Sequence, residues 1–419
     1  MIKPLPPDWR RVRLGDVLEQ VRRFEPLKPD HEYQLLGVKW YAEGVFERER
    51  RLGRAVAARQ LNRVEAGDFL YNRLFAWKGS FAVVGSGYAG GYVSGEFPVF
   101  RAKPGTVLEE FIYRYFSRPQ VWKQIEHQST GTTSVSRNRW KEEQFFAWHI
   151  SLPPLREQER IVAILRAVEE AIKANEEVIA RTRDLKTALG HEVLTHGLPG
   201  RHTRFKESPI GEIPAEWEMR KLGELLIRIE AGKSPKCEDH PAGPDEWGVL
   251  KVSAISSGQY LPQENKVAPS TMLPIPEIEV HAGDVLVVCA NGVADLVGRA
   301  AYVEQTLPRL MLSDKTLRLI PDLNKLDASL IPLLLASTFV RAQIESLWGG
   351  SSGQKNISQD SLRRVLIPVP PISEQRQMAE TLRAINHLEK ATQQAISFGQ
   401  ETRSMLMESL LNGYIRGLQ

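Results

Sequence analysis

The 419 residues carry a net charge of +4, with 42% hydrophobic and 25% charged residues, which is an ordinary composition for a globular protein of two or three domains. The sequence has no apolar run that could cross a membrane and no signal-peptide core at its start. Its two cysteines, Cys237 and Cys289, fit no CxxC pattern. These features exclude a membrane protein and a disulfide scaffold, and we expect a cytoplasmic chain.

The positive charge is concentrated in the first part of the chain. Residues 1–150 contain 24 Lys and Arg against 17 Asp and Glu, a net +7, whereas residues 201–370 contain 19 against 21, a net −2. A basic balance is expected of a protein that binds a polyanion. In the second part, contact with nucleic acid would have to depend on a local patch.

Residues 1–152 predict a globular part of the α+β class. Phe81–Val84 and Tyr92–Phe100 have the short apolar or alternating pattern of strands, and Glu109–Ser117 has the pattern of a helix. Gly85–Gly90 matches GxGxxG, but a dinucleotide site needs a helix to follow, and Gly91–Gly95 predicts a turn or strand. We interpret this stretch as a glycine-rich hairpin.

Two segments of this part could contact phosphates or bases. Phe46–Arg63 is rich in arginine and interleaved with glutamate, so it predicts either a solvated helix with internal ion pairs or a phosphate-binding segment. Ser129–Trp140 combines small hydroxyl residues with Arg and Asn, which can read base edges, although a purely structural turn is the alternative. The DNA-binding candidates of this part are Arg48, Arg51, Arg54, Arg73, Lys78, Thr132, Thr133, Arg137, Asn138 and Arg139.

Residues 153–197 predict a first long helix. It starts at a Pro-Pro pair, stops at Gly197, and would be about 60 Å long at 1.5 Å per residue. Apolar residues recur in alternating steps of four and three, which is typical of a coiled-coil seam that needs a partner helix. The candidate pairing residues are Ile161, Leu165, Val168, Ile172 and Ile179.

Residues 198–369 predict a connector and a second globular part with strands at Asp284–Val288, Arg299–Val303 and Thr316–Ile320 and a helix at Ala328–Leu347. The DNA-binding candidates here are Lys233, Lys236, Lys251, Asn291, Arg299, Ser352, Gln354, Lys355 and Asn356.

Residues 370–419 predict a second long helix and a C-terminal tail. The candidate pairing residues are Leu382, Ile385, Ile396 and Leu406. This seam is weaker than the first, because Glu389, Gly399 and Arg403 occupy positions where the phase favours apolar residues.

The second half of the chain repeats the first. Pro153-Pro154-Leu155-Arg156-Glu157-Gln158 returns 217 residues later as Pro370-Pro371-Ile372-Ser373-Glu374-Gln375. The PxxW…LG opening, a Gly-Asp strand, a further strand and a Ser/Gly loop also return in the same order. We therefore expect two similar α+β globular domains, each followed by a long helix, with the two helices paired as an antiparallel coiled coil about a pseudo-two-fold axis.

Catalytic chemistry is weakly represented. The sequence has no Walker A motif, no methyltransferase loop and no histidine spacing of a metal site, so we predict neither catalytic nor metal-binding residues. Asp245 and Glu264 form a loose PD…ExK pattern, which leaves a self-contained nuclease as an alternative. A coiled-coil assembly scaffold that does not bind DNA is the other alternative.

On these repeated openings, Ser/Gly loops and helix starts, the whole chain resembles the specificity subunit of a Type I restriction–modification enzyme. The resemblance implies a non-catalytic subunit with two target-recognition domains, each reading half of a bipartite double-stranded DNA site. It implies helices that act as spacers, two methyltransferase subunits as partners and, in some systems, two restriction subunits. S-adenosylmethionine, ATP and Mg are expected in those partners, with no cofactor in this chain.

Overall fold

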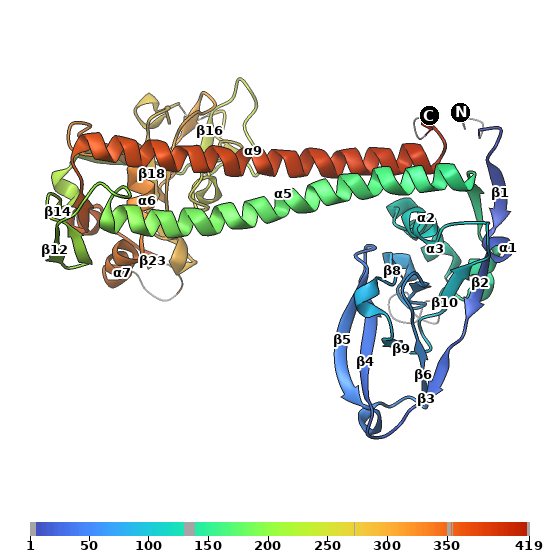
Figure 1. The fold of residues 1–419 in the computed structure, drawn as a ribbon. Coiled ribbons are helices and arrows are strands. Elements are labelled where there is room, and N and C mark those ends of the chain that lie inside the picture. Colours follow the sequence, from blue (N-terminus) through green and yellow to red (C-terminus); the bar gives the residue numbers. More distant parts are fainter. Residues whose placement is uncertain (1–5, 130–138, 272, 350–352, 354, 417–419) are drawn as a thin grey trace. The chain divides into compact units, whose positions relative to one another are not determined.

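A computed structural model of the protein describes residues 6–129, 139–271, 273–349, 353 and 355–416. The chain forms two compact units: unit 1 comprises Met1–Glu177 and Gln393–Gln419, and unit 2 comprises Val178–Thr392. Each unit contains one globular part and a portion of both long helices, α5 (Leu155–His196) and α9 (Ile372–Leu411) (Figure 1). No helix among the described residues is long and apolar enough to span a membrane.

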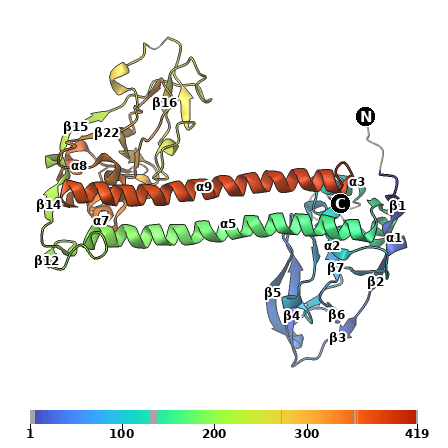
Figure 2. The ribbon, with the colours of Figure 1, turned by 45° about the horizontal axis from the view of Figure 1, so that its top comes forward.

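Proline and glycine residues mark the two ends of each long helix. Each starts directly after its Pro-Pro pair, and the glycines at the ends, Gly197 and Gly413, have φ of 80° and 69°, the left-handed conformation that terminates helices. In unit 2, Arg183 of α5 contacts Glu389, and the backbone N–H of Leu198 after α5 donates to Glu374 near the start of α9. The helices therefore pair antiparallel, as expected (Figure 2).

Each globular part contains a four-stranded sheet, and the two sheets have the same topology. In unit 1 the sheet has the order β2-β10-β7-β8, and in unit 2 the order β15-β22-β18-β20, with antiparallel neighbours in both. The unit 1 strands are β2 (Leu18–Val21), β7 (Phe69–Tyr71), β8 (Phe81–Val83) and β10 (Val99–Ala102). The unit 2 strands are β15 (Leu226–Ala231), β18 (Val285–Val288), β20 (Ala300–Tyr302) and β22 (Thr316–Pro321). The repeat in the sequence is thus a repeat of topology.

A short pair of strands accompanies the four-stranded sheet in each unit, and together they form a repeated frame. In each unit the strand after the PxxW opening pairs with the strand before the long helix: β1 (Arg10–Arg13) with β11 (His149–Leu152), and β14 (Glu218–Lys221) with β24 (Leu366–Val369). The connector after α5 forms a further hairpin, β12 (Phe205–Ser208) and β13 (Gly211–Pro214).

Additional sheets distinguish the two units. Unit 1 has a five-stranded sheet, β3 (Phe24–Pro26), β6 (Gln60–Arg63), β9 (Tyr92–Val93), β4 (Glu32–Val38) and β5 (Val45–Leu52), in that order. Unit 2 has a three-stranded sheet, β17 (Asn265–Val267), β16 (Gly248–Leu250) and β21 (Leu310–Met311). The repeated frame therefore carries different insertions in the two halves.

Helices pack the frame against the long helices. In unit 1, α2 (Glu109–Phe116), α3 (Pro119–Gln128) and α4 (Glu142–Ala147) share one core with the sheet and with Ile161 and Leu165 of α5. Unit 2 uses α6 (Ile331–Ala336), α7 (Thr338–Ser346) and α8 (Gln359–Arg364) in the same way. The single helix expected over Ala328–Leu347 is wrong, because Ser337 is extended (ψ 147°) and separates α6 from α7.

A buried glutamate joins each globular part to its long helix. Glu157 and Glu374 lie in the first turns of α5 and α9, and their side chains are 8% and 0% exposed. Each accepts a hydrogen bond of 3.2 Å from the indole N–H of the tryptophan in the PxxW opening, Trp9 in unit 1 and Trp217 in unit 2. The glutamine that follows each glutamate, Gln158 or Gln375, caps a backbone N–H of the same globular part at 2.9 Å.

Each buried carboxylate also has a side-chain partner from the segment that follows the other long helix. Arg416, after α9, donates to Glu157 at 2.9 Å. His202, after α5, lies 2.8 Å from Glu374 through Nε2 and 3.2 Å from Glu216 through Nδ1. A buried charge is tolerated only when such partners replace its lost hydration. The joint therefore requires both long helices to be in place.

Replacing Glu374 by leucine removes the acceptor of the Trp217 indole, which is fully buried, and the side-chain partner of the His202 ring. We expect the free energy of unfolding of the full chain to fall by about 3 kcal/mol, the usual cost of breaking a buried pair. Urea unfolding followed by tryptophan fluorescence measures it. The matched control is Glu380→Leu, at an exposed position of the same helix, for which we expect a change within about 0.5 kcal/mol; similar losses in both variants would contradict the joint.

Candidate nucleic-acid interface

In each unit, several candidate residues lie at one end of that unit's own four-stranded sheet. In unit 1 the N–H of Trp140 donates to the carbonyl of Arg73, just after β7, at 3.1 Å. In unit 2 the N–H of Ile357 donates to the carbonyl of Cys289, just after β18, at 2.8 Å. The same backbone connection thus brings the end of each Ser/Gly loop against the segment that follows the Gly-Asp strand.

The unit 2 end is polar and accessible. β19 (Ala290–Asn291) pairs with β23 (Lys355–Asn356), which places Asn291 opposite Lys355. Lys233 lies at the same end, since the N–H of Gly232 beside it donates to Thr316, the first residue of β22. Arg299 directly precedes β20, and its carbonyl accepts from the N–H of Val288, the last residue of β18. The side chains of Lys233, Arg299, Lys355 and Asn356 are exposed. Lys236 and Lys251 lie on other segments, before and after β16, so the structure does not group them with this end.

The corresponding cations of unit 1 have local partners. The Arg73 guanidinium contacts the carboxylate of Glu142, with one distance of 2.8 Å, and the two side chains are 24% and 18% exposed. The contact raises the pKa of Arg73; burial raises the pKa of Glu142, but hydrogen bonds from Arg73 and the backbone outweigh this and lower it. Arg139 pairs with Glu96 at 2.7 Å. Arg73 is therefore part of the framework of this end.

The helix considered for the arginine-rich segment Phe46–Arg63 is wrong, because the segment forms most of β5, a 3-10 turn (Gly53–Ala55) and strand β6. Its first residues extend as β5 because they pair with β4 along the chain from Glu32 to Val38. A shift of register between Leu35 and Leu36 leaves Arg48 as the extra residue of a β-bulge, 71% exposed and 3.9 Å from its one recorded acidic contact, Glu49. Arg51 and Arg54 are paired with Glu49 at 2.6 Å and Asp30 at 3.1 Å. Of the three, Arg48 is the most available to a phosphate.

Six candidates, Thr132, Thr133, Arg137, Asn138, Ser352 and Gln354, lie outside the described residues. Three exposed residues near the candidates were not identified from the sequence. Lys315 is exposed at the unit 2 end, where its carbonyl accepts from Cys289, and Trp40 and Tyr41 are exposed on the turn between β4 and β5. The adjacent aromatic residues Trp40 and Tyr41, placed between two segments with a strand pattern, could have identified this turn in the sequence.

The candidate pairing residues of the helices lie in or beside buried positions. Ile161, Leu165, Ile172, Ile179, Leu382 and Ile396 are buried, and Val168, Ile385 and Leu406 are partly buried. Glu389 is 8% exposed and accepts from Arg183 at 2.8 Å and Lys186 at 3.4 Å. Its pKa is lowered, chiefly by the hydrogen bond from Arg183. Gly399 faces Ile172, where an added Cβ would come within 2.8 Å. Two of the three exceptions in the weaker seam are thus accommodated by ion pairing and close approach, and the third, Arg403, is exposed.

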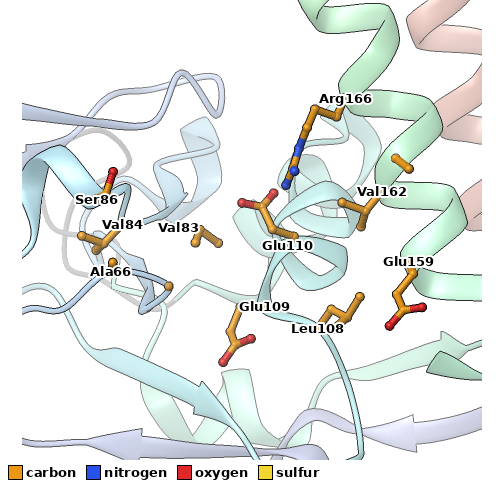
Figure 3. A pocket seen from close by; sticks show the side chains of 12 residues that line it. Ala66, Val83, Val84, Ser86, Leu108, Glu109, Glu110, Glu159, Val162 and Arg166 are labelled. Carbon is orange, nitrogen blue, oxygen red and sulfur yellow. The ribbon is translucent and has the colours of Figure 1, made fainter. Parts of the chain in front are cut away.

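A shallow hollow of about 470 Å³ lies between the unit 1 globular part and α5. Figure 3 shows the carboxylate of Glu110 on α2 pointing toward Arg166 of α5, with Leu108 between Glu109 and Glu159. The lining carries three carboxylates against one guanidinium. This balance repels phosphate, so we exclude the hollow from the interface.

The residues of the nuclease alternative have unrelated partners. Asp245 is 97% exposed and pairs with Arg309 at 3.0 Å, and Glu264 accepts from Ser253 at 2.7 Å. No group of three or more potential metal ligands occurs among the described residues. The GxGxxG stretch forms a single 3-10 turn, Ser86–Tyr88, before β9, so no helix begins there to bind a dinucleotide.

Comparison with known proteins agrees with this organisation. Residues 6–181 and 214–397 match the family model described as the Type I restriction modification DNA specificity domain, once in each half. Over 201 residues, 48% of the chain, it is 35% identical to the Type I restriction enzyme EcoEI specificity subunit of Escherichia coli, although the match spans 34% of that relative. It is 24% identical to the MjaVIII specificity subunit of Methanocaldococcus jannaschii over 98% of the chain and 94% of the relative.

Solved structures share the fold. The S subunit of the Type I system from M. genitalium aligns with a TM-score of 0.60 at 13% identity, covering 96% of each chain. The HsdS subunit from Thermoanaerobacter tengcongensis aligns with a TM-score of 0.50 at 21% identity, covering 99% of each chain. At these identities the likeness supports the architecture of two domains, each followed by a long helix.

We expect Arg73→Ala to destabilise the full chain by about 2 kcal/mol, since it leaves the partly buried Glu142 without its ion pair. Arg48→Ala, at the exposed bulge, should change stability by less than about 0.5 kcal/mol. The pKa of Glu142 is lowered in the folded state, so the pair stabilises the chain above the ordinary carboxylate pKa of about 4 and is lost as pH falls through the lowered value. Urea unfolding at pH 7 and at pH 3.5 should therefore show a smaller difference between Arg73→Ala and wild type at the lower pH; a constant difference would contradict the pairing.

Proposed function

The chain belongs to the family of Type I restriction modification DNA specificity domains, and we propose that it is the non-catalytic subunit that reads a bipartite double-stranded DNA sequence. Each unit would read one half of the site with the end of its four-stranded sheet. The observation that carries the proposal is the repetition of this end, with the same backbone connection from Trp140 to Arg73 and from Ile357 to Cys289. Two similar surfaces in one chain suit a target with two half-sites.

Polar side chains at these ends are suited to DNA. The exposed Lys233, Lys355 and Asn356 of unit 2 supply donors for phosphates and base edges although residues 201–370 are net negative. In unit 1, Arg48 is a further exposed cation, on β5 of the five-stranded sheet. The positive charge needed for DNA is thus concentrated locally in unit 2.

The chemistry would reside in partner subunits. We propose that two methyltransferase subunits carry S-adenosylmethionine and that, where restriction subunits are present, two of them supply the ATP- and Mg-dependent activity. The long helices would act as spacers that set the unspecific gap between the half-sites. The complex would act in the cytoplasm, where its DNA lies.

Expression of the chain with its methyltransferase subunits in cells that lack other adenine methylation tests the proposal. Sequencing that detects modified bases should show adenine methylated on each strand of one bipartite motif, and the pattern should vanish when this chain is omitted. Methylation without preference for a bipartite motif would refute the proposal.

The spacer role predicts the effect of helix length. Inserting seven residues between positions 177 and 178 and seven between 392 and 393 leaves the contacts within each compact unit intact. Seven residues add about 10 Å of helix while nearly preserving the seam phase. At 3.4 Å per base pair we expect the gap to lengthen by about three base pairs, with both half-site sequences unchanged in the methylated motif. Altered half-sites with an unaltered gap would contradict the spacer role.

A further inference from the structure

The turn between β4 and β5 in unit 1 has a left-handed backbone conformation at two residues that are not glycine. Tyr41 and Ala42 have φ of 57° and 55°, and the carbonyl of Trp40 accepts from the N–H of Glu43 at 3.3 Å. Two successive left-handed residues form a type I′ turn, for which Asn-Gly is preferred. A tyrosine and an alanine here cost conformational energy that Asn-Gly would avoid.

The neighbouring loop holds this turn in place. The N–H groups of Tyr41 and Ala42 donate to the carbonyls of Lys78 and Gly79 at 2.8 and 2.7 Å, and the Tyr113 hydroxyl donates to the carbonyl of Ala42 at 2.5 Å. Lys78 and Gly79 belong to the loop between β7 and β8, residues 72–80, which also contains Arg73. The turn is therefore fixed to the loop that begins at the end of the sheet described above.

The turn presents two aromatic rings, and the neighbouring loop places a cation beside them. Trp40 is 41% and Tyr41 60% exposed. The Lys78 ammonium lies 3.8 Å from the centroid of the Trp40 ring and 5.0 Å from that of Trp77, and Trp40 also contacts Phe75 at 5.4 Å. Among the described residues, no carboxylate lies within 4 Å of Lys78 in an ion pair. Apolar rings of this size are normally buried, so their exposure on a fixed turn indicates a binding surface.

We propose that the turn Trp40–Glu43 contacts DNA, with Trp40 and Tyr41 lying against bases or sugars of the half-site read by unit 1 and Lys78 against an adjacent phosphate. The inference rests on the proposed function and deepens it. Exposed aromatic rings beside a cation suit nucleic acid, which offers apolar ring faces and sugars next to phosphates. The bulged strand of the same hairpin carries Arg48, and residues 1–150 are net +7, so the charge favours a negatively charged partner such as DNA over a basic or neutral protein.

Two variants separate the side chains from the backbone. Tyr41→Gly removes the ring and also relieves the left-handed strain, so the melting temperature should stay the same or rise. Trp40→Ala removes the second ring. The control is Phe24→Ala, which removes a ring that is 40% exposed in the same unit, on β3 at the opposite edge of the five-stranded sheet.

Binding is measured on the full chain assembled with its methyltransferase subunits, with a duplex carrying the methylated motif, over a series of salt concentrations. We expect the Kd to rise at least tenfold for Trp40→Ala and for Tyr41→Gly, with an unchanged salt slope, because no phosphate contact is lost. Lys78→Met should weaken binding and reduce the salt slope by about one. Phe24→Ala should bind as wild type does.

The proposal is overturned if Trp40→Ala and Tyr41→Gly bind the duplex within twofold of wild type. It is overturned in favour of a protein partner if these variants lose methyltransferase subunits during purification while the assembled fraction keeps its affinity. A wild-type complex with no preference for a bipartite motif refutes the proposed function itself, whereas failure of the turn alone leaves that preference intact.

Discussion

The fold depends on a buried carboxylate at the start of each long helix. Glu157 and Glu374 are removed from water, and such a charge is stable only where several donors converge on it. One donor comes from the opening of the globular part, Trp9 or Trp217, and another from the segment after the opposite helix, Arg416 or His202. Three distant segments must therefore be in place before either carboxylate is satisfied. This requirement couples folding of the globular part to pairing of the helices.

The same interaction gives a physical reason for the repeated sequence signals. PxxW and PPxxEQ lie far apart in the sequence, yet they are joined by hydrogen bonds in each half. The glutamate accepts a hydrogen bond from the tryptophan indole N–H, and the glutamine accepts one from the backbone N–H of Leu108 or Asp327. These residues lie at the joint, away from the loop ends. The surface at those ends differs between the halves, because different additional sheets were inserted into one frame.

Local patterns in the sequence predicted the frame well. The Pro-Pro starts and glycine stops of the helices, the strands β8, β18, β20 and β22 and the antiparallel pairing follow from backbone chemistry and from periodicity, which act over a few residues. The single strand expected over Tyr92–Phe100 is wrong, because β9 ends at Val93 and β10 begins at Val99. The arginine-rich segment was ambiguous because Glu47, Glu49 and Arg50 have spacings that suit both a helix and a strand. Pairing with β4, a non-local contact, decided it. Ser337 separated two helices within an apolar run where the sequence contains neither Gly nor Pro as a stop signal.

The roles of the predicted surface residues were harder to infer, because availability depends on partners that spacing does not encode. Arg73 and Glu142 are 69 residues apart, and Arg139 and Glu96 are 43 apart, so neither pair could be recognised from a motif. Arg48 became available through a β-bulge, a feature of register and not of composition. A net charge therefore says little about which cations can reach a ligand. In unit 1 several arginines stabilise the protein, whereas in unit 2, despite its negative balance, Lys233 and Lys355 lie exposed beside the same sheet end. Because the joints at Glu157 and Glu374 lie apart from these ends, the exposed residues can change without altering the contacts that hold each unit together.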